Sequence, residues 1–166
     1  MHKKTKRHGG IMEFVVGIGE IKVTKNNGTL VALGLGSCIC VALYDTKNRI
    51  GGLAHILLPY SSEDSRNPKY ANHAIPTLIE EMRKMGAKRE NIVAKISGGA
   101  QIFKHMTLEF LKIGEKNIKA VREILKKLNI RIVAEDVGGT RGRNVYFFVS
   151  NGKLLVRYSN GENVWI

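Results

Sequence analysis

The residues best suited to chemistry in this chain are a cysteine beside a glycine-rich bend and a histidine in the next apolar segment. Residues 30–43 form an apolar run that is interrupted by Gly34-Leu35-Gly36-Ser37 directly before Cys38. Glycine is disfavoured inside strands, so two glycines beside a thiol indicate a sharp bend that another group approaches closely. We expect the bend to expose Cys38 at an edge, where the backbone N–H groups near Gly36 and Ser37 could stabilise an oxyanion.

A cysteine nucleophile also needs a base, and His55 has the most suitable surroundings among the histidines. It lies in the apolar segment 51–59, which predicts a strand one step after the strand of Cys38. Successive strands usually neighbour each other, so the two residues could form a dyad in which the imidazole lowers the pKa of the thiol. On residue types alone, His55 could equally be a hydrogen-bonded core histidine. Cys40 fits the commoner use of cysteine as a small buried hydrophobe.

Other uses of these residues need patterns that the sequence lacks. A structural zinc site requires four ligands at recognisable spacings, and Cys38-x-Cys40 with scattered histidines does not supply them. Gly34-Leu35-Gly36 is followed by a strand pattern instead of a Gly-Lys-Ser/Thr sequence and a helix, so it does not predict a nucleotide loop. We therefore expect neither a metal nor a cofactor.

Length and composition predict one globular domain. The chain has 166 residues, of which 43% are hydrophobic and 25% are charged, as is ordinary for globular proteins. Residues 1–10 are basic and carry no apolar pattern, so we expect a disordered leader followed by a single domain over residues 11–166. The two cysteines cannot form a disulfide framework and no apolar run is long enough to span a membrane, which favours a cytoplasmic protein.

The formal net charge of +13 favours an acidic partner, although the lysines are spread out and could simply form a solvated surface. Aromatic residues make up only 7% of the chain and do not alternate with basic ones in the pattern that binds single-stranded nucleic acid. Charge is the one argument in favour of nucleic-acid binding, and we expect no such binding. We also expect no membrane insertion.

The elements that must position Cys38 and His55 follow an α+β pattern. Apolar residues recur at helical spacing in 71–85 and 118–128, which predicts two main helices. Period-two and apolar runs predict about eight strands, over residues 13–23, 29–35, 38–44, 49–58, 91–97, 130–134, 144–150 and 153–158. Hairpin signals such as Asn151-Gly152 favour largely antiparallel sheets, with 29–35 and 38–44 as a central pair. Gly-Gly pairs beside apolar runs, at 51–52, 98–99 and 138–139, predict tight strand ends around one site.

At these residues the sequence resembles the chemoreceptor glutamine deamidases of the CheD family. The shared motifs keep the family's order along nearly the whole chain: Leu33-Gly34-Leu35-Gly36-Ser37-Cys38, Ala54-His55 with Leu58-Pro59, Ala94-Lys95 with Gly98-Gly99-Ala100, Ile113-Gly114 with Asn117, and Gly138-Gly139 with Arg143. The resemblance implies that Cys38 is the nucleophile and His55 its base, on a fold similar to the deamidating domain of cytotoxic necrotizing factor toxins. The implied substrates are glutamines on the helical cytoplasmic region of methyl-accepting chemotaxis receptors, and the implied partner is a CheC-type phosphatase.

The sequence departs from the family at its third catalytic residue, a threonine six positions before the cysteine. This chain has Ala32 there, and alanine has no hydroxyl to orient an imidazole. Thr29 is nearby, but an odd offset of three puts it on the opposite face of the strand, so it could substitute only if the strand bulges. A backbone carbonyl could hold His55 instead.

The predicted function is therefore hydrolysis of protein glutamine side chains through a thioester on Cys38. The alternative is a catalytically weak adaptor that binds chemoreceptors or a CheC-type phosphatase. The missing hydroxyl at Ala32 makes this alternative more credible.

Overall fold

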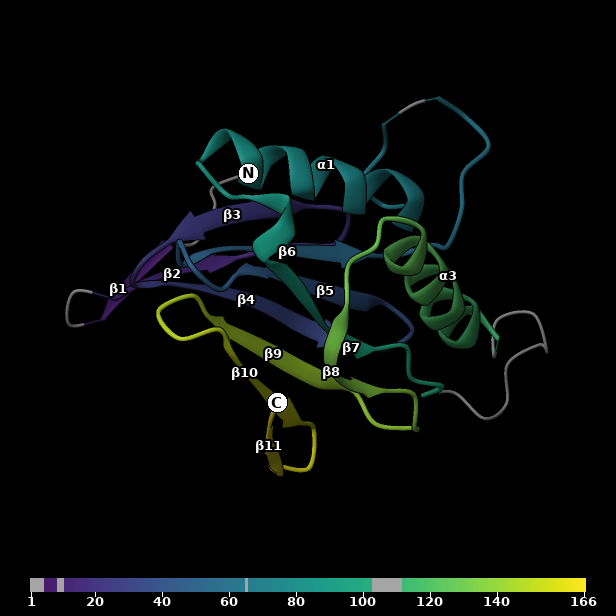
Figure 1. Ribbon diagram of the computed structural model, residues 1–166. Coiled ribbons are helices and arrows are strands. Elements are labelled where there is room, and N and C mark those ends of the chain that lie inside the picture. Colours follow the sequence, from purple (N-terminus) through teal and green to yellow (C-terminus); the bar gives the residue numbers. More distant parts are fainter. Residues whose placement is uncertain (1–4, 9–10, 65, 103–111) are drawn as a thin grey trace.

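Among the described residues, two β-sheets pack face to face, and two α-helices cover one of them (Figure 1). The computed structural model describes residues 5–8, 11–64, 66–102 and 112–166. Helices α1 (Ala71–Lys84) and α3 (Ile113–Lys127) pack on the face of the five-stranded sheet that is directed away from the other sheet. This arrangement confirms the α+β fold class with two main helices.

Most strand pairs are antiparallel, as the sequence predicts, and β2–β4 and β7–β8 are parallel. The six-stranded sheet has the order β1 (Thr5–His8), β2 (Ile11–Val15), β4 (Gly28–Leu35), β9 (Arg143–Phe148), β10 (Lys153–Tyr158) and β11 (Asn163–Trp165). The five-stranded sheet has the order β3 (Ile21–Lys25), β6 (Ile50–Ile56), β5 (Ile39–Asp45), β7 (Ile92–Gly98) and β8 (Ile132–Val137). A short 3-10 helix, η1 (Arg89–Asn91), precedes β7.

The two helices bury one apolar face each, at the spacing that the sequence predicts. The buried residues of α1 are Ala71, Ala74, Ile75, Leu78, Ile79 and Met82. Those of α3 include Ile118, Val121, Ile124 and Leu125. Gly86 follows the end of α1 with a φ of 104°, a backbone conformation that favours glycine and stops a helix.

Strand β5 lies at the centre of the five-stranded sheet and separates two cores. Ile39, Val41 and Leu43 pack beneath the helices, whereas Cys40 and Ala42 face the six-stranded sheet. Alternate residues of a strand point to opposite faces, so a strand buried on both sides contributes to two layers. The face of β5 that carries Cys40 is therefore the inter-sheet face.

Two strand predictions are wrong in the same way, because each joins segments that belong to different sheets. The expected strand 13–23 is divided into β2 and β3, with a turn over residues 17–20 in which Gly19 has a φ of 73°. The expected central pair 29–35 and 38–44 corresponds to β4 and β5, which do not pair with each other. The bend before β5 carries the chain from one sheet to the other. A hairpin and a change of sheet need similar turn residues, so the local pattern does not separate them.

The expected disordered leader contains a strand at residues 5–8, and its other residues, 1–4, 9 and 10, lie outside the described residues. Strand β1 pairs with β2, from Thr5 opposite Phe14 to His8 opposite Ile11. An edge strand pairs through backbone groups, so it can form without the apolar alternation that the sequence lacks there.

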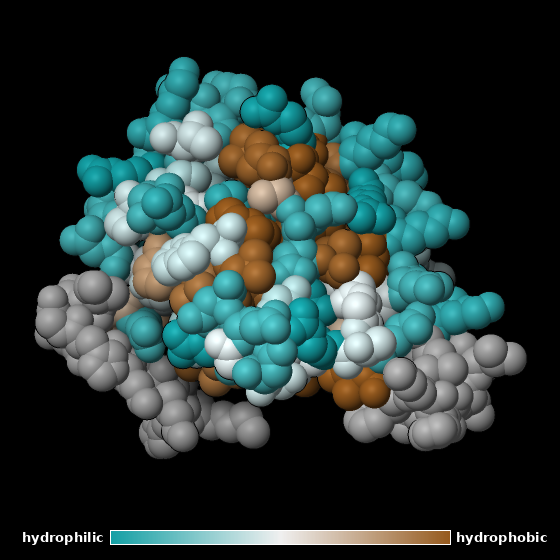
Figure 2. Space-filling model, turned by 90° about the horizontal axis from the view of Figure 1, so that it is seen from below, coloured by the Kyte–Doolittle hydropathy of each residue, from teal (hydrophilic) through white to brown (hydrophobic). Residues whose placement is uncertain are grey.

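The side of the molecule opposite the helices mixes apolar and hydrophilic side chains (Figure 2). The strand register aligns Val31, Tyr146, Leu155 and Trp165 across β4, β9, β10 and β11. Within the described residues, no helix is long and apolar enough to cross a membrane.

Candidate active site

Cys38 lies at the bend between the two sheets, one residue before β5 begins. Its side chain belongs to the inter-sheet core, and only 6% of the residue is exposed. The expectation of an exposed thiol is wrong, because the bend turns the side chain inward between the sheets. Cys40 is fully buried two residues further on, so Cys38 is the cysteine that keeps some contact with solvent.

The bend is held by the segment that follows β7. The N–H of Gly99 donates to the carbonyl of Cys38 at 2.8 Å, and the N–H of Ala100 donates to the carbonyl of Gly36 at 2.8 Å. Gly98 has a φ of 118°, and a Cβ there would lie 2.3 Å from the carbonyl oxygen of Cys38. Only glycine permits this close approach.

The backbone N–H groups of Ser37 and Cys38 form no hydrogen bond to the backbone of any described residue. Both carbonyls of the bend that flank them, those of Gly36 and Cys38, are already bonded to residues 99 and 100. Within the described residues, two donors beside the thiol therefore have no backbone acceptor, and one of them belongs to Ser37, where the sequence predicts oxyanion stabilisation.

His55 of β6 lies next to the bend on the inter-sheet face. The antiparallel register of β5 and β6 places Cys40 directly opposite His55. Cys38 precedes Cys40 by two residues and its side chain lies in the same inter-sheet layer. Residues in this relation are diagonal neighbours, whose Cα atoms are typically about 7–8 Å apart. The register and the shared layer thus place Cys38 and His55 diagonally across the end of the β5–β6 pair.

A backbone carbonyl orients the imidazole. Nδ1 of His55 lies 3.0 Å from the carbonyl oxygen of Val16, and because a carbonyl only accepts, Nδ1 must carry the proton. Nε2 then holds the lone pair, is buried, and has no hydrogen-bond partner among the described residues. No sequence signal could identify Val16, because every residue has a carbonyl and this contact spans 39 positions.

Thr29 is not brought to His55. Leu30 and Ala32 face the inter-sheet core, so Thr29 lies on the outer face of β4. Its partners in the register are Glu13 and Phe148 of the same sheet. The irregularity in β4 falls between Ala32 and Leu35, after Thr29, and does not turn it inward.

Burial dominates the acid–base properties of both groups. It raises the pKa of the Cys38 thiol, against a smaller opposite effect of the residue's own backbone N–H. Burial lowers the pKa of His55, against the smaller effects of the Val16 carbonyl and the negative charge of Glu20. Desolvation disfavours the charged forms, so the resting pair is a neutral thiol and a neutral imidazole. Both shifts oppose the lowering of the thiol pKa by the imidazole that the sequence predicts.

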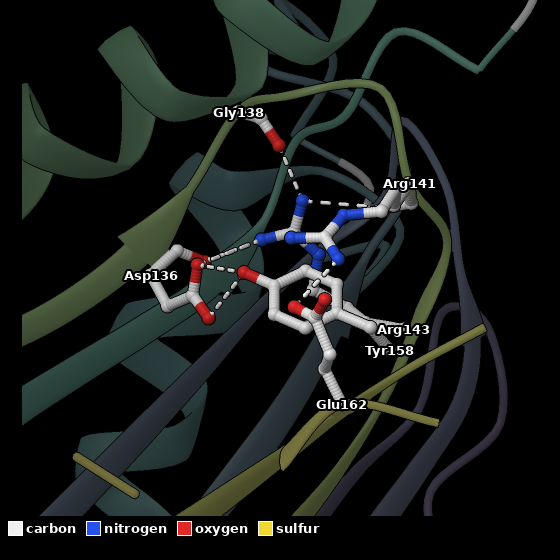
Figure 3. A network of polar contacts seen from close by, with 6 residues as sticks. All are labelled: Asp136, Gly138, Arg141, Arg143, Tyr158 and Glu162. Carbon is white, nitrogen blue, oxygen red and sulfur yellow. Dashed lines mark hydrogen bonds and ion pairs between the residues drawn. The ribbon is translucent and has the colours of Figure 1, made fainter. Parts of the chain in front are cut away.

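Arg143 organises a polar network with Asp136 and Tyr158 (Figure 3). Nη1 of Arg143 donates to the backbone carbonyl of Asp136 at 2.8 Å and to its Oδ1 at 3.1 Å. Nη2 donates to the carbonyl of Gly138, and the hydroxyl of Tyr158 donates to Asp136 Oδ2 at 2.6 Å. Arg143 is thus a buried cation that is held almost entirely by this loop and this carboxylate.

The network supports the bend through two of the three glycine pairs. The N–H of Gly138 donates to the carbonyl of Gly98, and the N–H of Gln101 donates to the carbonyl of Gly139. The pairs at 98–99 and 138–139 therefore meet around Cys38 as predicted. The pair at 51–52 lies within β6 and gives room to core side chains instead.

Arg143→Met is expected to lower the free energy of unfolding by about 3 kcal/mol, because it leaves the Asp136 carboxylate without its buried cation. Arg141 provides a matched control, since its guanidinium also lies over the Tyr158 ring but its ion pair with Glu162 is exposed. Arg141→Met should change the same quantity far less, because an exposed ion pair contributes little to stability. Urea unfolding of both variants measures the difference, and equal effects would contradict the structural role of Arg143.

A cavity of about 460 Å³ lies beside the bend. Its lining includes Gly34, Leu35, Ile102, Arg143 and Tyr158. Ile102 also packs against Gly36, where a Cβ would lie 2.9 Å from its side chain. In the part of the chain that the structure describes, no group of three or more His, Cys, Asp or Glu residues could hold a metal ion.

Fold and site together define a class of protein: an α+β domain of two packed sheets in which Cys38, at a strand bend, and His55, on the next strand, both lie on the inter-sheet face. Residues 57–158 match the family model described as CheD chemotactic sensory transduction. The chain belongs to the CheD family. The matched segment begins after His55, so neither Cys38 nor His55 is part of that match.

Relatives align over most of the chain. A "Probable chemoreceptor glutamine deamidase CheD" of Archaeoglobus fulgidus is 53% identical over 93% of this chain and 98% of its own length. The "Chemoreceptor glutamine deamidase CheD" of Thermotoga maritima is 46% identical over 90% of this chain and 94% of its own length. Among solved structures, the hypothetical protein YfiH of Bacillus licheniformis aligns with 70% of this chain and 49% of its own, at 17% identity and a TM-score of 0.42.

Proposed function

We propose that this protein is a cytoplasmic enzyme that deamidates glutamine side chains of methyl-accepting chemotaxis receptors, with Cys38 as nucleophile and His55 as base. The observation that carries the proposal is the imidazole of His55, which is fixed by Val16 with an unprotonated Nε2 on the face that also holds the Cys38 thiol. The names of the relatives, chemoreceptor glutamine deamidases, support the choice of substrate.

The reaction proceeds in two steps that both use His55. In the first, Nε2 accepts the thiol proton while Cys38 Sγ attacks the glutamine Cδ, and the N–H groups of Ser37 and Cys38 stabilise the oxyanion. The imidazolium returns its proton to the amide nitrogen, the C–N bond breaks, and ammonia leaves a thioester. In the second, His55 deprotonates a water that attacks the thioester, and the thiolate leaves and regains a proton. The net reaction converts an amide and water into a carboxyl group and ammonia.

The encounter with the receptor is electrostatic in part. A net charge of +13 attracts an acidic surface, and added salt should weaken this attraction. The proposal includes a CheC-type phosphatase as a second partner, for which the support is the family resemblance.

Incubation with a purified receptor cytoplasmic fragment tests the function. Each converted glutamine should add the mass difference between an amide and a carboxylic acid, and peptide mapping should locate the change. An unchanged mass together with retained binding would instead support the alternative, a catalytically weak adaptor, which the missing hydroxyl at Ala32 favours. An unchanged mass without binding would contradict both.

Glu20→Gln is expected to extend activity to lower pH. The negative charge of Glu20 raises the pKa of His55, so its removal lowers that pKa further below the ordinary value of about 6.5. The base must be neutral, so kcat/KM rises as the pH increases through the pKa of His55, and the midpoint of this rise should move to lower pH. The shift should stay below about one pH unit, because the Glu20 side chain is 46% exposed and screened by solvent.

Glu63→Gln is a suitable control, since Glu63 is an exposed acid with no effect on the pKa of His55. Profiles of kcat/KM against pH for the two variants and the wild type give the comparison. A midpoint in Glu20→Gln that stays in place or moves to higher pH would contradict the assignment of His55 as base.

A further inference from the structure

We infer that Asn117 is a positioning residue that locks the peptide between Ser37 and Cys38 in the orientation needed for the oxyanion site. Asn117 is fully buried on α3, and its Nδ2 donates to the carbonyl of Ser37 at 2.9 Å and to the carbonyl of Leu57 at 3.0 Å. Ser37 directly precedes Cys38, and Leu57 follows His55 by two residues. One amide group thus joins the two segments that carry the dyad. The inference rests on the proposed deamidase function.

The amide of Asn117 acts at the point where the β5–β6 ladder stops. Ile39 opposite Ile56 is the last pair, and beyond it the N–H groups of Leu57 and Leu58 both donate to the carbonyl of Lys69. The carbonyls of Ser37 and Leu57 are both acceptors, so they cannot bond to each other. A side-chain NH2 group, with two donors, satisfies both and keeps the bend attached to β6.

The orientation of the Asn117 amide follows from its neighbours. A flipped amide would direct its oxygen at two carbonyl oxygens, which is unfavourable. In the observed orientation Oδ1 is buried and has no hydrogen-bond partner among the described residues. An unpaired buried acceptor destabilises a folded protein, so packing alone would favour an apolar residue at this position. The two N–H donors of Asn117, which bond the carbonyls of Ser37 and Leu57, explain why an amide occupies this position.

With Asn117 included, three consecutive carbonyls of the bend are fixed. The carbonyl of Gly36 accepts a hydrogen bond from Ala100, the carbonyl of Ser37 accepts one from Asn117, and the carbonyl of Cys38 accepts one from Gly99. A trans peptide is planar, with its N–H and C=O on opposite sides. Holding the Ser37 carbonyl toward α3 therefore directs the Cys38 N–H away from α3, toward the side where the oxyanion forms in the proposed mechanism.

Helix α3 is a rigid support for this contact. Gly114 and Ile118, on the same side of the helix, pack against Gly99: a Cβ on Gly114 would lie 2.5 Å from the Gly99 carbonyl oxygen, and one on Gly99 would lie 2.5 Å from Ile118. The helix that carries Asn117 thus also contacts the segment that bonds Cys38 and Gly36. The bend is fixed from two directions by elements in direct contact.

Asn117→Asp and Asn117→Ala test the inference. We expect kcat for deamidation to fall about a hundredfold, as for the loss of one oxyanion donor, with KM changed less than about threefold. Alkylation of Cys38 by iodoacetamide forms no oxyanion, so its rate and its pH dependence should change less than about threefold. Asn117→Ser keeps one hydrogen-bond donor and replaces the other two variants if they fail to fold. It should fold and show a smaller loss of kcat.

A matched control is Asn72→Asp, because Asn72 of α1 likewise donates from Nδ2 to a loop carbonyl, that of Ser61, at 2.9 Å. Its kcat should stay within about threefold of wild type. An unchanged kcat in the Asn117 variants, or a loss of alkylation equal to the loss of kcat, would overturn the role in orienting the peptide. Absence of turnover in the wild type would instead overturn the proposed function itself.

Discussion

Cys38→Ala is expected to lower the rate of receptor glutamine deamidation by at least about four orders of magnitude. The thiol forms the covalent intermediate, and without it His55 and the backbone donors can only assist direct attack by water. Mass analysis of the receptor fragment measures the rate, since each conversion changes the mass of one glutamine. The fold should survive, because alanine occupies part of the space of the buried cysteine side chain and introduces no polar group.

Cys40→Ala is the control for this substitution. Cys40 lies two residues away on the same inter-sheet face, and burial raises the pKa of its thiol so strongly that it stays protonated. We expect its removal to leave the rate within about threefold of wild type, with a modest loss of stability from the small cavity. Deamidation by Cys38→Ala at a rate near that of wild type would contradict the thioester mechanism. A large loss of deamidation rate in Cys40→Ala, together with a normal rate in Cys38→Ala, would instead identify Cys40 as the nucleophile.

His55→Asn is expected to lower the same rate by about three orders of magnitude or more. The asparagine amide can still donate to the Val16 carbonyl, so the substitution removes the base while it retains a donor for the contact that holds the residue. The neutral thiol then has no proton acceptor. Because burial raises the pKa of Cys38, the remaining activity should increase with pH well above the range where the wild type is active.

Kinetics of Cys38 alkylation complement this measurement. In the wild type, the rate should fall at acidic pH as His55 becomes protonated, and in His55→Asn this dependence should disappear. His73→Asn provides the control, since His73 of α1 lies outside the inter-sheet face. A His55→Asn variant that keeps both the wild-type rate and the wild-type pH profile would show that His55 is a core histidine, the alternative that its residue type leaves open.

The sequence alone determined the features that depend on neighbours along the chain. Helical spacing of apolar residues predicted α1 and α3, and Asn151-Gly152 predicted the β9–β10 hairpin, because side-chain periodicity and turn chemistry are local properties. Glycines beside a thiol predicted the bend at Cys38 for the same reason. The family motifs, which run in order along the chain, predicted the family.

The tertiary structure alone decided how those features meet. Only the fold shows that the bend joins two sheets, that it turns Cys38 inward, and that Val16 and Asn117 supply the contacts around His55 and Ser37. The first contact joins residues that are 39 positions apart, and the second joins residues that are 80 positions apart. Both acceptors are backbone carbonyls, which every residue possesses. The pKa directions also follow from burial, which no single segment sets. The sequence therefore predicted which groups react, whereas packing decided how His55 is oriented and in which direction the pKa values of both groups shift.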